Sequence, residues 1–422
     1  MPDYELADEL AALLASPPGN VAGPLSGVVV LDITRVVAGP YCSMILADLG
    51  ATVIKVEHPG QPDYTREFPP MLTSDRGEGF SAFFAQFNRN KLAITLDLGS
   101  AEGKEVLRSL ASKADVLVEN FRAGAMDRLG LGYHDLRKVN PRLVYAALSG
   151  FGQTGPRHRS PAYDNSAQAT GGLWSMNGLP GQPPVRVGTI IGDLAATFYG
   201  VIGTLAALRH AELTGEGQLV DISQQDSVLS LTENAVVSYT VSGTVPQPLG
   251  NQHPFVRPYE LFACKDGFVF FGGYTDKFWR IACELFGEPE TADDPTIDTM
   301  AKRFDERTYQ SRVKPVVERW FATRTKAELE QVAGDLIPLS AVKDIAEVVA
   351  DPQIAARDMV VEVDYPDHGP LSMVGSPLKL SATPANPRGL APAFGAHTAH
   401  VLRVMAGVDE ERLAELRAAG TV

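Results

Sequence analysis

Short apolar runs alternate with helical patterns along the first half of the chain. The β-branched run Gly27–Ile33 (GVVVLDI) predicts a strand that is buried on both faces. Helical spacing follows at residues 40–49, with Pro40 at the start, and again at 100–111, with Ser100 as N-cap. Further strands are expected at residues 52–57, 92–98, 116–119 and 143–148. This alternation predicts an α/β layer built on a mainly parallel sheet.

The pattern changes in the second half. Residues 194–210 predict a long apolar core helix and 224–237 a second helix, whereas Ser242–Pro258 holds four prolines and two glycines, as in a linker or mobile loop. Acidic, Ala/Leu-rich residues 1–16 predict a helix at the start. We expect a large α/β domain over residues 1–225, a linker and mobile loop over 226–258, a smaller α+β domain over 259–336, and a linker with a C-terminal part that returns to the large domain over 337–422.

Composition and charge exclude several classes of protein. The net charge is −14, and no run of Lys or Arg provides the basic face that a nucleic-acid partner requires. Three cysteines without close spacing, and no CxxC or HExxH motif, predict a reducing compartment and no metal site. No basic, apolar secretory signal is present, and no apolar run seems to reach the roughly 20 residues that span a bilayer. We therefore expect a cytoplasmic protein without a membrane partner.

One glycine motif is misleading. Residues 150–155 (GFGQTG) match the dinucleotide pattern G-x-G-x-x-G and follow a predicted strand. The third glycine of that pattern opens a helix, but Pro156 and poor helix-forming residues follow here. A nicotinamide dehydrogenase is therefore not expected.

Asp193 allows two interpretations. It stands where an apolar run meets the long helix, so it is expected as an N-cap. A carboxylate at a helix N-terminus is also kept ionised by the helix dipole and can act as a nucleophile. Gly192 beside it would let a substrate approach closely. Basic residues near strand ends could together hold a phosphate-rich ligand: Arg89, Lys91, Arg122, Arg128, Arg157 and Arg159.

Ordered motifs from about Leu25 to the C-terminus resemble the class III CoA-transferases, the family of formyl-CoA:oxalate and carnitine CoA-transferases and of α-methylacyl-CoA racemase. The matching stretches are LSGVVVLDITRVVAGPYCSMILADLGATVIKVEHPGQPD, FNRNKLAITLDL, ADVLVENFRAGAMDRLGL, NPRLVYAALSGFGQTGP, IIGDLAA, TGEGQLVDIS and FGAHTAHVL. The resemblance implies a Rossmann-like large domain, a smaller middle domain and an interlocked homodimer.

The resemblance also implies roles for particular residues. Asp193 would be the catalytic aspartate, forming an acyl anhydride and then an aspartyl-CoA thioester, and Gly250, Asn251 and Gln252 would belong to the mobile lid loop. Coenzyme A would be a substrate and no permanent cofactor, held by the following residues: Leu96, Asp97, Leu98, Asn120, Phe121, Arg122, Arg128, Ser160 and Tyr163.

Departures from the family pattern bear on the reaction. Racemases of this family carry a histidine before an aspartate where this chain has Tyr163-Asp164, and a phenol, with an ordinary pKa of about 10, is a poor base at neutral pH. This favours a transferase, with a racemase or a non-catalytic CoA-binding protein as alternatives. Oxalate-using members carry a glutamine at the position of Val37 and a tryptophan near Phe68. We therefore expect a larger acid than oxalate, such as a dicarboxylate with succinyl-CoA as donor.

Overall fold

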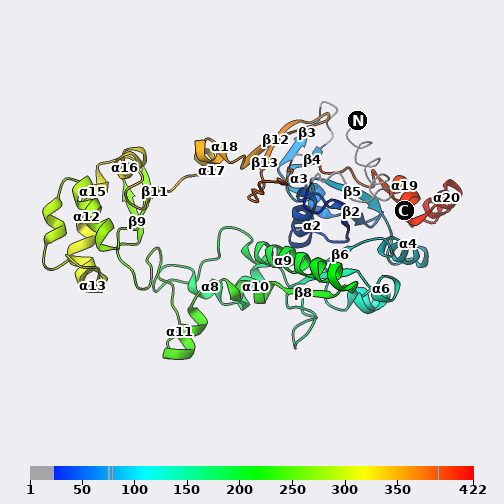
Figure 1. Cartoon of the computed structure of the whole chain (residues 1–422), viewed down its shortest axis with the longest axis horizontal. Coiled ribbons are helices and arrows are strands. Elements are labelled where there is room, and N and C mark those ends of the chain that lie inside the picture. Colours follow the sequence, from blue (N-terminus) through cyan, green and yellow to red (C-terminus); the bar gives the residue numbers. More distant parts are fainter. Residues whose placement is uncertain (1–22, 75–76, 78, 388) are drawn as a thin grey trace. The chain divides into compact units, whose positions relative to one another are not determined.

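The computed structural model describes residues 23–74, 77, 79–387 and 389–422. The helix expected at residues 1–16 lies outside these residues. The chain divides into two compact units, which are described separately (Figure 1). The larger unit takes in the chain up to Trp174, Val187–Val237 and Gln353–Val422, and the smaller unit takes in Ser175–Arg186 and Ser238–Pro352.

A six-stranded parallel sheet forms the centre of the larger unit. Its strand order is β5-β2-β1-β6-β7-β8, and every neighbouring pair is parallel. The predicted mixed α/β fold with a parallel sheet is thereby confirmed, including every strand expected from the apolar runs. The strands are β1 Val29–Asp32, β2 Thr52–Glu57, β5 Lys91–Thr95, β6 Val116–Glu119, β7 Val144–Ser149 and β8 Leu219–Ser223.

Successive residues of these strands enter two different apolar cores. Val30 packs in a cluster with Leu46 and Leu208, from helices α2 (Ala38–Asp48) and α9 (Ile191–Thr214). Leu31 packs in a second cluster, with side chains of α4 (Ala101–Ala111) and of the C-terminal helices. Because side chains alternate across a strand, burial on both faces requires an apolar residue at nearly every position. The sequence run VVVL meets this requirement.

Further elements complete the larger unit. Ser100 caps α4, as predicted, by accepting from the Gly103 N–H at 3.0 Å. The remaining helices are η1 Tyr64–Glu67, α3 Ala82–Asn88, α5 Ala125–Leu129, α6 Tyr133–Val139, α7 Asp164–Thr170, α8 Leu173–Met176 at the boundary, α10 Gln224–Ser230, α18 Pro352–Ala356 at the boundary, α19 Thr398–Val401, η4 Leu402–Ala406 and α20 Glu410–Ala418. Two antiparallel pairs join β3 Met71–Thr73 to β4 Gly79–Ser81, and β12 Val360–Tyr365 to β13 Gly369–Val374.

Helix α9 is longer and more apolar than the sequence pattern suggested. It has 24 residues, and an 18-residue window reaches a mean hydropathy of 1.5, so length and composition alone would allow it to cross a membrane. The expectation that no apolar segment reaches this length was therefore wrong. Half of the window is buried inside the protein, where α9 packs on α2, β7 and β8. This packing is that of a core helix.

The single helix expected at residues 224–237 is also wrong. The structure has α10 up to Ser230 and then α11 (Ala235–Ser242), with Glu233 between them at φ 53°. A left-handed residue cannot continue a right-handed helix, so the chain turns there.

The smaller unit is built around a three-stranded antiparallel sheet, in the order β11-β10-β9. Its aromatic core includes Trp279, Trp320 and Phe321. The strands are β9 Glu260–Cys264, β10 Gly267–Phe271 and β11 Leu339–Ala341; the helices are α11, which begins at the boundary, α12 Asp276–Leu285, η2 Pro289–Asp293, α13 Met300–Phe304, α14 Glu306–Thr308, η3 Tyr309–Val313, α15 Lys314–Ala322, α16 Lys326–Ala333 and α17 Ile345–Val349.

Buried charges join the first strands of the larger unit to the segments around them. The Lys91 ammonium donates to Asp32 Oδ2 and Pro40 O at 2.9 Å, to Asn88 Oδ1 at 2.9 Å and to Phe87 O at 3.1 Å. Lys91 and Asp32 are both fully enclosed. Arg89 is likewise buried and donates to Asp48 and to Val374 O. The expectation that Arg89 and Lys91 help hold a phosphate is therefore wrong, because internal partners occupy both.

We expect Lys91→Met to lower the free energy of unfolding by about 3–5 kcal/mol, because it leaves Asp32 charged and buried without its cation. Chemical denaturation measures the effect. The control is Lys138→Met, which removes an exposed pair with Asp135 and should cost less than about 1 kcal/mol. Equal losses for the two variants would contradict a stabilising role for the Lys91–Asp32 pair.

Candidate active site

Asp193 lies in the first turn of α9, but it is not the N-cap that the sequence suggested. The helix begins at Ile191, which makes Asp193 its third residue. A carboxylate from another helix serves the open helix end instead: Asp164 Oδ1 accepts from the Gly192 N–H at 2.7 Å, and Asp164 Oδ2 accepts from Gln168 Nε2 at 2.7 Å. The N-terminal N–H groups of a helix need such an outside acceptor.

Gly192 is required for this contact. A Cβ placed on it would lie 3.0 Å from Asp164 Oδ1 and 3.1 Å from Asp164 O. The missing side chain therefore lets Asp164 approach the helix, a role different from the close approach of substrate that the sequence suggested.

Two neighbours act on the Asp193 carboxyl. Gln224, the first residue of α10, donates from Nε2 to Asp193 Oδ1. Burial raises the pKa of Asp193 to about 7, the negative charge of Asp164 raises it further, and the Gln224 hydrogen bond opposes both effects. At neutral pH, Asp193 is thus near the midpoint of its titration, where proton loss makes it an available nucleophile.

A cavity of about 140 Å³ opens beside Asp193. The loop after β1 forms one wall of this cavity, and Val36 has the left-handed φ of 73°, which is rare for a β-branched residue. We call it the Asp193 cavity. Its lining residues are Val36, Val37, Ala38, Asn120, Leu148, Ser149, Gly150, Ala162, Tyr163, Asp193 and Gln224.

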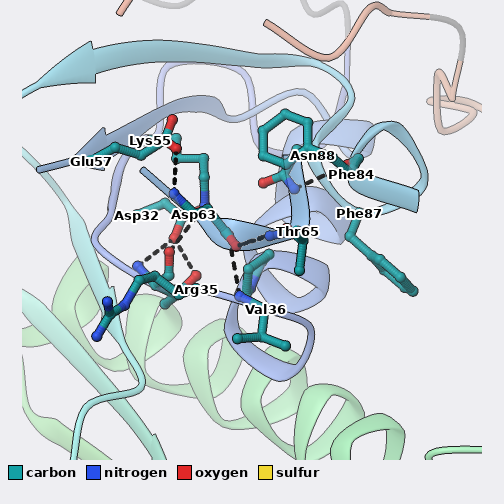
Figure 2. A network of polar contacts seen from close by, with 12 residues as sticks. Asp32, Arg35, Val36, Lys55, Glu57, Asp63, Thr65, Phe84, Phe87 and Asn88 are labelled. Carbon is teal, nitrogen blue, oxygen red and sulfur yellow. Dashed lines mark hydrogen bonds and ion pairs between the residues drawn. The ribbon is translucent and has the colours of Figure 1, made fainter. Parts of the chain in front are cut away.

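A buried carboxylate fixes this loop (Figure 2). Asp63 Oδ2 accepts from the Val36 N–H at 3.1 Å and from the Lys55 ammonium at 3.1 Å, while Asp63 Oδ1 accepts from the Thr65 hydroxyl at 2.7 Å. The Lys55 ammonium also donates to Thr34 O at 3.0 Å. The Lys55–Asp63 pair therefore holds the loop from both sides of Val36.

A second cavity, of about 190 Å³, lies at the carboxyl ends of β1, β2, β5 and β6, where ligands bind in open parallel sheets. We call it the strand-end cavity. It is lined by Ile33, Arg35, Val56, Glu57, His58, Gln61, Asp63, Leu96, Asp97, Leu98, Gly99, Phe121 and Leu129.

The two cavities share two stretches of backbone. Arg35 lines the strand-end cavity and Val36 lines the Asp193 cavity; Phe121 and Asn120 are divided in the same way. Asn120 joins these stretches, because its side chain accepts from the Arg35 N–H at 3.0 Å and donates to Arg35 O at 2.7 Å. An elongated ligand lying across this double bond between loops would reach both cavities.

The structure brings part of the predicted site together. Leu96, Asp97, Leu98 and Phe121 line the strand-end cavity, whereas Asn120 and Tyr163 line the Asp193 cavity. The other predicted residues are not among the lining residues of these two cavities. They are Arg122, Arg128 and Ser160 in the larger unit and Gly250, Asn251 and Gln252 in the smaller one.

Sequence reasoning missed Gln224 and left Asp164 without a role. Gln224 directly follows β8, so the rule that functional residues gather at the carboxyl ends of parallel strands could have found it. The role of Asp164 depends on a contact 28 residues away along the chain and had no local signal. Among the described residues, no group of three or more His, Cys, Asp or Glu side chains is placed to hold a metal ion.

We expect Asp193→Asn to raise the melting temperature at pH 8. The folded-state pKa lies above the ordinary value of 3.8, so the folded protein loses stability as the pH rises from about 4 through 7 and Asp193 ionises. The amide cannot ionise, and the gain should be about 1–2 kcal/mol at pH 8 and smaller at pH 5. Thermal denaturation at the two pH values measures it, with Asp135→Asn as the exposed control. A gain that does not change with pH would contradict the assignment.

Three comparisons with known proteins agree with this geometry. The chain is 39% identical to the succinyl-CoA:mesaconate CoA-transferase of Haloarcula hispanica, over 90% of this chain and 96% of that protein. It is 37% identical to the acetyl-CoA:oxalate CoA-transferase of Acetobacter aceti, over 86% and 91% of the two chains. The crystal structure of a CAIB/BAIF family protein from Brucella suis matches with a TM-score of 0.79 at 32% identity, covering 90% of this chain and 98% of that one.

The family model gives the same result over most of the chain. Residues 25–398 match the model of CoA-transferase family III, which spans both the Asp193 cavity and the strand-end cavity. The resemblance seen in the sequence motifs is thereby confirmed, and the chain belongs to CoA-transferase family III.

Proposed function

We propose that this enzyme moves coenzyme A from a dicarboxylic acyl-CoA such as succinyl-CoA to a second dicarboxylic acid, with Asp193 carrying the transferred groups. The position of Asp193 carries this proposal: it is a carboxyl group with a pKa of about 7 in a cavity that adjoins a second, strand-end cavity. A non-catalytic CoA-binding protein has no need of a carboxyl group whose ionisation is so strongly disfavoured.

Coenzyme A is long enough to need both cavities. Its nucleotide half would enter the strand-end cavity, against Leu96, Leu98 and Phe121, and its thioester would reach Asp193 across the Arg35 and Asn120 backbone. Arg35, whose guanidinium carbon lies 5.4 Å from the centre of the Phe121 ring, brings a positive charge to this path. Phosphate groups are bound well by such a planar cation. Arg122, Arg128 and Ser160 would contact CoA only on the rim of this path.

The reaction divides into exchanges between thioester and anhydride. An Asp193 oxygen attacks the donor thioester carbon and expels the CoA thiolate, which leaves a mixed anhydride. The thiolate then attacks Asp193 Cγ and releases the donor acid, which leaves an aspartyl-CoA thioester. The acceptor carboxylate attacks Cγ, expels the thiolate and forms a second anhydride. Attack of the thiolate on the acceptor acyl carbon restores Asp193 and yields the new acyl-CoA.

Water has to be kept from these intermediates, because hydrolysis would waste the thioester. We propose that residues 250–252 take part in a lid. Gly250 has a φ of 65°, and its N–H donates to Gly178 O at 2.9 Å. A segment with few side-chain contacts can move at little cost.

We further propose that the enzyme is a homodimer of interlocked subunits. The support is apolar surface on α9, where Phe198 is 47% exposed and Ile202 is 61% exposed. A contiguous apolar face of this kind is typical of an interface between subunits.

Two observations support an acid larger than oxalate. Val37, at the wall of the Asp193 cavity, has no amide to bind a second carboxylate close to Asp193, and Phe68 lies outside the lining of that cavity. The relative from Haloarcula hispanica is named for succinyl-CoA and mesaconate, both derived from dicarboxylic acids.

We expect acyl-CoA and hydroxylamine to modify the Asp193 peptide, because hydroxylamine captures either acyl intermediate as a hydroxamate. Intact-mass and peptide-mass measurements detect the product. Asp193→Asn should form no adduct and should lose at least 10³-fold in the exchange rate, on the order of what removing a covalent nucleophile costs. A wild-type enzyme that forms no adduct with several donors would contradict the covalent route. Uptake of solvent deuterium at the α-carbon without any acceptor would indicate a racemase instead.

We expect a four- or five-carbon pair, such as succinyl-CoA with mesaconate or glutarate, to give a kcat/KM at least about 10-fold above that for formyl-CoA with oxalate. A favourable contact or an unpaired polar group worth about 1.4 kcal/mol makes such a factor. Steady-state assays of purified enzyme measure it, with acetyl-CoA and oxalate as a further pair. Equal or better use of oxalate would refute the assignment.

A further inference from the structure

Gln224 is the polar side chain nearest to the reacting group. It is 8% exposed, it lines the Asp193 cavity, and its Nε2 donates to Asp193 Oδ1. A buried amide would lose free energy if it had no partner, so the bond to Asp193 determines where the Gln224 side chain points. Neither the packing of the helices nor the binding of CoA requires an amide at this position.

The backbone that carries Gln224 is held on both sides. Ser223 caps α10 by accepting from the Asp226 N–H at 3.1 Å, and the Ser227 hydroxyl returns to Ser223 O at 2.7 Å. Next to Gln224, the Gln225 N–H donates to Gly150 O at 3.1 Å. Gln224 is therefore a donor fixed before any substrate binds, and a fixed donor needs no reorganisation during a reaction.

We propose that Gln224 is a catalytic residue of the transfer, which keeps its amide N–H on Asp193 Oδ1 through every intermediate and stabilises the negative charge that forms there. This inference rests on the proposed covalent route. It assigns different roles to the two oxygens of Asp193: Oδ2 makes and breaks bonds, and Oδ1 accepts the charge.

The charge develops in two of the four steps. When the CoA thiolate attacks Cγ of the anhydride, a sulfur–carbon bond forms and the carbonyl electron pair moves to Oδ1. The pair returns as the bond between Cγ and Oδ2 breaks, and the donor acid leaves as its carboxylate. Attack of the acceptor carboxylate on the aspartyl thioester repeats this sequence, with the CoA thiolate as leaving group. Gln224 would donate to the same oxygen in both tetrahedral intermediates.

A neutral donor suits this position. A Lys or Arg side chain there would stabilise the Asp193 carboxylate in its resting state and make it a weaker nucleophile. The amide provides a hydrogen bond without a full charge, so burial and Asp164 still set the pKa of Asp193 at about 7. The donor can then bind the transition state more strongly than the ground state, which is the condition for catalysis.

The test is Gln224→Met, which removes the donor and retains most of the side-chain volume. We expect kcat to fall by about 10²–10³-fold, the usual effect of removing one oxyanion donor, with the KM for acyl-CoA changed by less than about 3-fold. The acid limb of the pH–rate profile should shift to higher pH, because the hydrogen bond no longer opposes the rise in the pKa of Asp193.

A second readout separates this role from a structural one. Without an acceptor acid, wild-type enzyme mixed with acyl-CoA should accumulate the aspartyl-CoA thioester, which intact mass detects. In Gln224→Met, attack on Cγ is slowed, so less thioester should form and more acyl-CoA should be lost to hydrolysis for each transfer. Gln225→Leu is the matched control: it removes the neighbouring amide, which donates to Thr170 O at 3.0 Å, and should leave all readouts near wild type.

Gln224→Glu tests the same point if the methionine variant does not fold, because it keeps the shape and replaces the donor with an acceptor at pH 8. It should lose at least as much in kcat. A wild-type kcat, pH profile and thioester yield in either folded variant would overturn the role of Gln224 and leave the covalent route intact. A wild-type enzyme without any Asp193 adduct would instead refute the covalent route, and the role of Gln224 with it.

Discussion

Two lysine–aspartate pairs, taken completely out of water, hold the first loop of the sheet in place. A buried charge without a partner costs several kcal/mol, so the sequence must place each ammonium against acceptors. Lys91 meets Asp32, and Lys55 meets Asp63; the side chains of both pairs are fully enclosed. Because Asp63 also accepts from the Val36 N–H, the same electrostatic requirement determines the backbone that separates the two cavities. The site is thus positioned by the interior of the protein as much as by its surface.

The sheet and its helices could be predicted because each depends on a local pattern. The run VVVL at β1 and the Ser100 cap of α4 carry their information within a few residues. The failures all involve distant partners. Arg89 and Lys91 looked like ligand-binding cations, but Asp48 and Asp32 occupy them from 41 and 59 residues away. Asp193 looked like an N-cap because the acceptor that does cap α9, Asp164, comes from another helix.

The candidate site divides along the same line. Asp193, Leu96 and Phe121 came from the family motifs, and they line cavities where such residues are expected. Gln224 has no motif of its own, and only the structure brings it to the carboxyl of Asp193. Arg122 and Arg128 are exposed, and the positions they take with CoA bound depend on side chains that are free to rotate. Motifs therefore predict which segments meet a ligand better than they predict which atoms do.

Gly192 shows how a residue without a side chain can set a chemical property of its neighbour. A Cβ at this position would meet Asp164 at 3.0 Å and Ala167 Cβ at 3.2 Å, so any other residue would push the two helices apart. Coulomb repulsion falls as charges separate, and the Asp193 carboxyl would then ionise more readily. The range of acidity in which the enzyme works is thus encoded partly at a position that cannot itself gain or lose a proton. Mutational drift at Gly192 is constrained by chemistry that takes place on the next residue.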